Sequence, residues 1–153
     1  MEINLNLIEL HVFRIVHSEI EFLLLKRSRE QIYPGLWQMV NGKIKAGEKA
    51  YQAAVRELLE ETGLSPIQLW VVPNVNSFYS AQSDNLIFIP VFAAKVNSKN
   101  QVVISSEHED FCWVNAEEAK KLLAWEGQRK SADLIVKYFN EDKHFFDLLE
   151  IEF

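Results

Sequence analysis

The stretch that decides the fold runs from Gly42 to Leu64 and reads GKIKAGEKAYQAAVRELLEETGL. Successive residues of a helix are about 100° apart, so the apolar residues of 50–62 fall on one side of a helix. We expect that side to pack on the core, and it comprises Tyr51, Ala54, Val55, Leu58, Leu59 and Thr62. We expect the helix to begin at Gly47 and Glu48, with an acid in its first turn, and to end at Gly63.

Three carboxylates gather on the opposite side of this predicted helix. Glu57, Glu60 and Glu61 recur at i, i+3 and i+4, and no Lys or Arg interrupts them, although Arg56 can reach Glu60. One interpretation is a solvated acidic face, as on many surface helices. The other is a site for a hard divalent cation, since Mg²⁺ takes oxygen ligands and is often shared with substrate phosphates.

The spacing of these residues resembles a known motif. Gly42, Glu48 and the run Arg56 to Leu64 match every constrained position of the Nudix box, G-x5-E-x7-R-E-U-x-E-E-x-G-U, where U is a bulky aliphatic residue. The resemblance implies an α/β protein with the Nudix α/β/α sandwich and a mixed β-sheet. It also implies an Mg²⁺- or Mn²⁺-dependent hydrolase of nucleoside diphosphates linked to another group. One departure is Asn41-Gly42, where family members commonly carry Gly-Gly.

Length and composition are those of one globular domain, which we expect to span residues 1–153. Cys112 is the single cysteine, which excludes an internal disulfide and favours the cytoplasm. We expect no signal peptide and no membrane segment, because the N-terminus lacks a basic region followed by an apolar core and no apolar run is long enough. The net charge of −6 argues against binding to duplex nucleic acid.

Alternating and apolar runs predict strands around the box. We expect two strands within residues 3–26, long strands at 67–79 and 85–96, and a short strand at 102–104. Gly127 is expected to separate two C-terminal helices. The apolar tail HFFDLLEIEF indicates either packing onto the domain or a homodimer contact, and the sequence leaves both open.

A second acidic stretch, residues 105–114, precedes an apolar strand. It holds Glu107, His108 and Glu109, and read alone it is typical of a solvated turn. It also resembles the E-H-x4-W segment of many Nudix enzymes, through Glu107, His108 and Trp113. The resemblance implies that Glu107 serves as metal ligand or general base, with Glu109 as the fallback and His108 in a structural hydrogen bond.

Four residues are candidates for binding substrate. Arg27 follows a predicted strand and could contact phosphate, or it could be an ordinary surface arginine. Tyr33 could stack on a base, although a loop tyrosine is often only half-buried. Phe78 and Tyr79 could line a base pocket, or Phe78 could fill the core while Tyr79 lies at an edge.

The resemblance also implies a mechanism and a role in it for each of these residues. It implies that the metal ligands are Gly42, Glu57, Glu60, Glu61 and Glu107, with Gly42 acting through its carbonyl. Glu107, or a box glutamate such as Glu60, accepts a proton from the attacking water. Arg56 orients the glutamates through charge-assisted hydrogen bonds.

The preferred substrate is a nucleoside or dihydroneopterin triphosphate, cut to monophosphate and pyrophosphate. One alternative is a diadenosine polyphosphate hydrolase, for which Tyr79 lies close to the expected tyrosine. A second is a nucleotide-binding sensor without turnover, which has no need of the intact glutamates.

Overall fold

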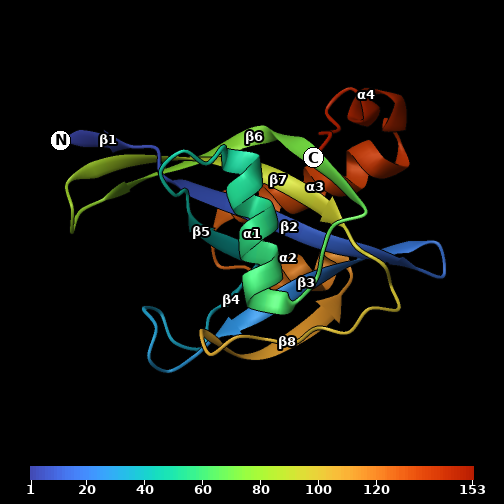
Figure 1. Ribbon diagram of the computed structural model, residues 1–153, viewed down its shortest axis with the longest axis horizontal. Coiled ribbons are helices and arrows are strands. Elements are labelled where there is room, and N and C mark those ends of the chain that lie inside the picture. The colour runs from blue at the N-terminus through green and yellow to red at the C-terminus, as the bar shows by residue number, and fades with distance from the viewer.

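The computed structural model describes residues 1–153 as an eight-stranded mixed sheet with helices on both faces (Figure 1). The strands are β1 (Glu2–Asn4), β2 (Leu7–Val16), β3 (Glu19–Arg27), β4 (Trp37–Gln38), β5 (Val40–Lys43), β6 (Gln68–Ser80), β7 (Asn85–Lys95) and β8 (His108–Val114). The helices are α1 (Ala50–Thr62), α2 (Ala116–Leu122), α3 (Glu126–Asn140) and α4 (Lys143–Asp147). None of these helices is long and apolar enough to cross a bilayer.

Strand β2 organises the sheet, because it pairs on both of its edges. On one edge it runs parallel to β7, and on the other it is antiparallel to β5 and then to β3. Strand β6 extends the sheet beyond β7, β8 extends it beyond β3, and the short β1 lies parallel to the start of β7. The parallel and antiparallel pairs confirm the predicted mixed sheet.

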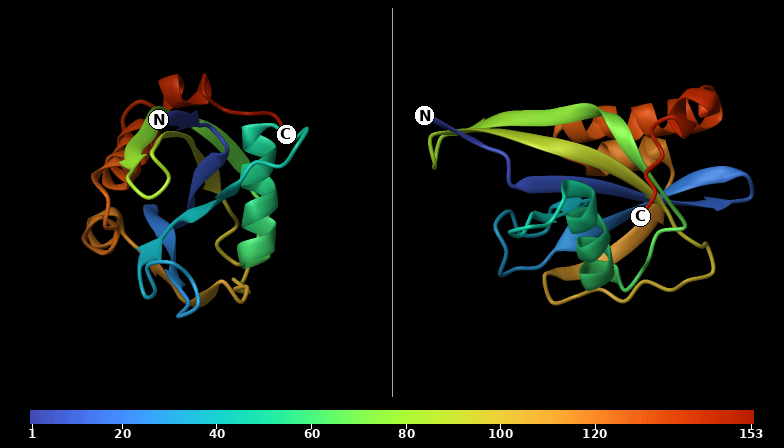
Figure 2. Two further views of the ribbon diagram at one scale, coloured as in Figure 1. Left: turned by 90° about the vertical axis from the view of Figure 1, so that its left-hand side faces the viewer. Right: turned by 45° about the horizontal axis from the view of Figure 1, so that its top comes forward.

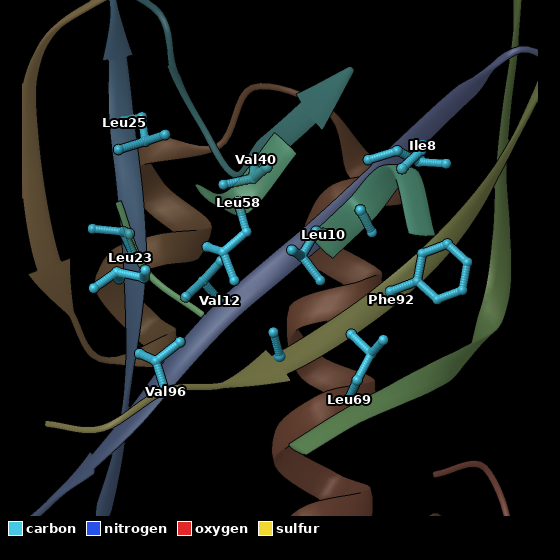
Figure 3. Close-up of a cluster of buried hydrophobic side chains, with 14 residues drawn as sticks. Ile8, Leu10, Val12, Leu23, Leu25, Val40, Leu58, Leu69, Phe92 and Val96 are labelled. Atoms are coloured by element: carbon cyan, nitrogen blue, oxygen red, sulfur yellow. The ribbon is translucent and has the colours of Figure 1, made fainter. Parts of the chain in front are cut away.

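Two apolar clusters hold the helices on opposite faces of the sheet (Figure 2). Side chains of α1 such as Leu58 pack on alternate residues of β2, which include Leu10 and Val12 (Figure 3). The other face carries Phe13 and Trp70, and it is covered by residues of α2, α3 and α4. The α/β/α sandwich expected from the sequence is therefore confirmed.

The helix of the box differs from its prediction in two details. It begins at Ala50, after the N-cap Lys49, and has no acid in its first turn, so the predicted start at Gly47 is wrong. Leu59 is 55% exposed and not part of the core, because Ala54 and Leu58 centre the contact with the sheet and Leu59 lies one 100° step beyond it. The end is as expected: Gly63 is left-handed, with φ 73°, and its N–H bonds to Leu59 O.

The structure decides three predictions made for residues 102–153. Residues 102–104 form no strand; the N–H of Val103 instead donates to Thr62 O at the end of α1. Gly127 does not separate two helices but lies in the first turn of α3. The tail packs onto the sheet: Phe146 stacks on Trp70 with ring centroids 4.7 Å apart, and Ile151 N donates to Leu69 O.

Candidate metal and diphosphate site

The acidic residues of α1 meet the start of β8 at one edge of the sheet. Glu61 is only 2% exposed, and its Oε1 atom lies 3.9 Å from Nε2 of His108. One ligand atom each from Glu61, Glu107 and His108 lie within 4.8 Å of one another. Residues 46 positions apart are thus brought together by the packing of α1 against the sheet.

Glu61 is strongly perturbed by this environment. Burial raises its pKa to about 9, and the nearby charges of Glu57 and Glu107 act in the same direction. Its Oε2 atom is buried and has no hydrogen-bond partner. A carboxyl without a partner in such surroundings is protonated at neutral pH unless a cation replaces the proton.

His108 is held as a neutral structural residue. Burial lowers its pKa to about 4, and the charge of Arg27 adds to this effect. The Oε1 atom of Gln38 accepts bonds from Arg27 and Asn41, which leaves the Gln38 amide nitrogen to donate to Nε2 of His108 at 3.2 Å. That bond occupies the Nε2 lone pair, so we assign the ligand role to the carboxylates and the hydrogen-bonding role to His108.

Gly42 lies directly beneath Glu57. A Cβ atom added at Gly42 would lie 2.3 Å from Cδ of Glu57, so only glycine lets this carboxyl settle over β5. The Glu57 side chain is 14% exposed, and burial raises its pKa. This close approach explains in physical terms why the motif needs a glycine at this position.

Arg56 holds the acidic residues in place. It donates to Oε1 of Glu48 at 2.7 Å, to Glu57 at 2.8 Å, to Glu60 at 3.2 Å and to the carbonyl of Lys43 at 2.8 Å. Its hydrogen bonds lower the pKa of Glu48 to about 2. The expectation of a carboxylate cluster uninterrupted by a cation is therefore wrong, since Arg56 lies among three of the glutamates.

Glu107 and the alternative acid Glu109 have different surroundings in the structure. Glu107 is exposed beside Glu61, and its backbone carbonyl accepts a bond from the N–H of Ser28 at 3.1 Å. Glu109 instead pairs with Lys26, with the charged atoms 3.4 Å apart. The Glu60 side chain is 52% exposed. Glu60 and Glu107 are therefore both acids that face solvent near the buried Glu61.

The predicted substrate residues lie in different places. Arg27 donates to Gln38, and its charge is close enough to lower the pKa of Glu61. Tyr33 is 58% exposed and meets Trp125 edge-to-face, with ring centroids 6.0 Å apart. Phe78, 47% exposed and so not in the core, and Tyr79 lie near the far end of the β6–β7 hairpin, which Figure 1 shows projecting away from the C-terminal end of α1.

Tyr79 is not brought to the acidic site. Its hydroxyl donates to Asp84 at 2.8 Å, within the hairpin turn. The same hairpin is long enough to extend beyond the body of the sheet, so its tip residues contact each other and β1.

No role in this site was expected for two carboxamide residues, Gln38 and Asn41. Gln38 is 5% exposed and connects Arg27, Asn41 and His108 through its side chain. The available signal was a pair of carboxamide residues in the apolar segment before the box glycine. Without the neighbouring strands, nothing indicated that they face one another.

The oxygen atoms gathered here fit a hard divalent cation. The Glu57 carboxyl lies over the Gly42 backbone and its charge acts on Glu61, which keeps a buried oxygen without a partner. Such carboxylate and carbonyl oxygens are the ligands that Mg²⁺ and Mn²⁺ use. The residues present therefore fit the cation that the motif implies.

Comparisons with known proteins identify the family of this chain. The sequence profile of the NUDIX domain matches residues 10–135. The chain belongs to the Nudix family, and it is a Nudix pyrophosphohydrolase.

The chain is similar to two enzymes in sequence and to a third in fold. It is 32% identical over 113 residues to bis(5'-nucleosyl)-tetraphosphatase [asymmetrical] of Caenorhabditis elegans, covering 72% of this chain and 79% of that protein. It is 25% identical to nucleoside triphosphatase NudI of Klebsiella pneumoniae, covering 69% of this chain and 81% of that one. The fold of the Escherichia coli dihydroneopterin triphosphate pyrophosphohydrolase is similar, with a TM-score of 0.67 and 24% identity over 84% of this chain and 94% of that chain.

Proposed function

We propose that this chain is a divalent-cation-dependent pyrophosphohydrolase that cuts a nucleoside or dihydroneopterin triphosphate into its monophosphate and pyrophosphate. The observation that carries the proposal is the proximity of Glu61 to Glu107 at one edge of the sheet, with the charge of Glu57 acting on Glu61 and Arg56 bonded to Glu57. We further propose that residues 1–153 act as one catalytic domain.

Each residue has a separate task in this proposal. The groups that would hold an Mg²⁺ or Mn²⁺ ion are Glu57, Glu60, Glu61, Glu107 and the carbonyl of Gly42. When bound, the cation neutralises the diphosphate and acidifies a coordinated water. Glu107 faces solvent beside Glu61 and accepts the proton of the attacking water, with Glu60 as the alternative base.

Arg56 and Arg27 support the reaction from two sides. Arg56 restricts Glu57 and Glu60 by charge-assisted bonds, so it orients the ligands and does not touch the substrate. The positive charge of Arg27 acts on Glu61, and we propose that the same charge attracts a phosphate of the substrate. Tyr33 and Trp125 offer exposed aromatic surface for a ring.

A diadenosine polyphosphate hydrolase is the second candidate, favoured by the 32% identical relative. Its expected tyrosine, however, is Tyr79, whose hydroxyl bonds Asp84 at the hairpin tip. The sensor alternative is disfavoured by the complete set of box glutamates and by the arginine that arranges them.

A substrate panel tests the proposal directly. The purified protein is incubated with Mg²⁺ or Mn²⁺ and with nucleoside triphosphates, dihydroneopterin triphosphate and diadenosine tetraphosphate, and the products are separated by chromatography. We expect monophosphate and pyrophosphate, with no turnover in EDTA. Nucleoside diphosphate plus orthophosphate as the main products, or full turnover in chelator, contradicts the proposal.

We also propose a cytoplasmic location for this protein. The single cysteine still favours the cytoplasm. The C-terminal tail buries Phe146 within its own chain, so a homodimer would have to use other surfaces, such as the exposed Leu148.

A further inference from the structure

A buried carboxylate lies on the face of the sheet opposite α1, at Glu9 of β2. Glu9 is 3% exposed; its Oε1 atom accepts a bond from Nδ2 of Asn76 at 2.8 Å, and its Oε2 atom has no partner. His11, two residues along the same face, also has a buried and unpaired Nε2 atom. A buried carboxylate oxygen without a hydrogen-bond partner destabilises a fold, so its presence in Glu9 calls for an explanation.

Carboxamides and the first turn of α3 surround this carboxylate. The amides of Asn76 and Gln128 act to lower the pKa of Glu9, against the burial that raises it. Asn74 donates to the carbonyl of Gly127 at 3.3 Å. A Cβ atom at Gly127 would lie 1.9 Å from Oδ1 of Asn76, so a larger residue there would displace the side chain that bonds Glu9.

The surroundings of Glu9 adjoin the metal and diphosphate site across β5. Glu9 is paired in register with Asn41, and the next residue, Gly42, lies beneath Glu57. Successive residues of a strand point to opposite faces, so Asn41 shares the face of Glu9 while Gly42 shares that of α1. In the sheet β5 pairs with β2, so the two sites lie on opposite faces of one strand pair.

We propose that Glu9 determines the substrate of the pyrophosphohydrolase proposed above, by accepting two N–H donors from a 2-amino-4-oxopyrimidine edge, as in guanine and pterin rings. An ionised carboxylate offers only acceptors and pairs well with two adjacent donors. Adenine presents one donor next to an acceptor nitrogen, which repels the second oxygen. The Gln128 side chain rotates aside when the ring enters, since Glu9 is otherwise covered.

The matched substrates GTP and ITP differ only in the exocyclic amino group, so they isolate this contact. For the wild type we expect kcat/KM with GTP to exceed that with ITP by about 10–100-fold, as for one hydrogen bond to a charged group. Glu9→Gln should bring the ratio of kcat/KM with GTP to kcat/KM with ITP to within about threefold. A purely structural defect lowers both rates equally and preserves the ratio. Glu2→Gln, which changes an exposed carboxylate of β1, is the control and keeps the wild-type ratio.

Binding of GMP and IMP by calorimetry provides a readout that needs no turnover. If no triphosphate is hydrolysed, the proposed function fails, yet a preference for GMP that Glu9→Gln abolishes still supports the assignment of Glu9. If dihydroneopterin triphosphate is turned over faster than GTP, the ring that Glu9 recognises is a pterin. The reverse order indicates guanine. If Glu9→Gln does not fold, Asn76→Ala removes the 2.8 Å bond that positions the carboxylate and should also reduce the GMP preference. Equal binding of GMP and IMP by the wild type, ATP as the best substrate, or an unchanged preference in the variants overturns the proposal.

Discussion

Metal binding should become tighter as pH rises, because Glu61 must lose a proton to hold a cation. Its pKa is raised to about 9 in the metal-free protein, so below that pH the apparent affinity should gain about tenfold per pH unit. Between pH 6 and pH 8 the gain for Mg²⁺ should therefore reach roughly 10²-fold. His108, whose pKa is lowered to about 4, is neutral over this whole range and releases no proton.

Isothermal titration of Mg²⁺ at pH 6, 7 and 8, in buffers of different ionisation enthalpy, measures both the affinity and the protons released. Glu61→Gln is the control, since an amide is neutral at every pH. It should bind more weakly and show a flatter slope. An affinity that stays constant for the wild type from pH 6 to pH 8 refutes the reasoning.

The same raised pKa has a consequence for stability without metal. The folded state holds a proton on Glu61 that the unfolded state releases near pH 4.5. The stability that this proton provides is complete below about pH 4.5 and is lost as pH rises to about 9. Thermal melts in EDTA should show this decline for the wild type and a weaker one for Glu61→Gln.

Three further substitutions test other parts of the structure. Glu107→Gln should lower kcat by ~10²–10⁴-fold if Glu107 is the general base, while Glu109→Gln, whose carboxylate pairs with Lys26, stays near wild type in steady-state assays. The opposite ranking would move the base to Glu109. Gly42→Ala should reduce Mg²⁺ affinity in titrations, because the new methyl group occupies the place of a ligand carboxyl; unchanged affinity contradicts that geometry. Phe146→Ala should cost about 3–5 kcal/mol in denaturant unfolding, whereas Phe145→Ala, at a 53% exposed position, should cost much less.

Local spacing determined much of the fold and part of the site. The run from Gly42 to Leu64 predicts a helix with an apolar face and an acidic face, since those features depend only on the 3.6-residue period. It also predicts the left-handed end at Gly63, which is a local backbone property. Leu59 shows the limit of this reasoning, because the period gives a direction around the helix but not the width of the surface that the sheet covers.

Contacts between distant segments were decided only by the tertiary structure. The resemblance implied that Glu107 lies beside the box. Only the structure distinguishes Glu107 from Glu109 as the candidate acid, because Lys26 of β3 pairs with Glu109. The raised pKa of Glu61 requires burial by the folded chain, and the lowered pKa of His108 requires burial together with the charge of Arg27 from β3. Glu9 was passed over as one acid within an apolar strand, because its burial arises from β6 and α3. The sequence alone determines which residues can share a face of one element, whereas desolvation and charge coupling depend on which faces meet.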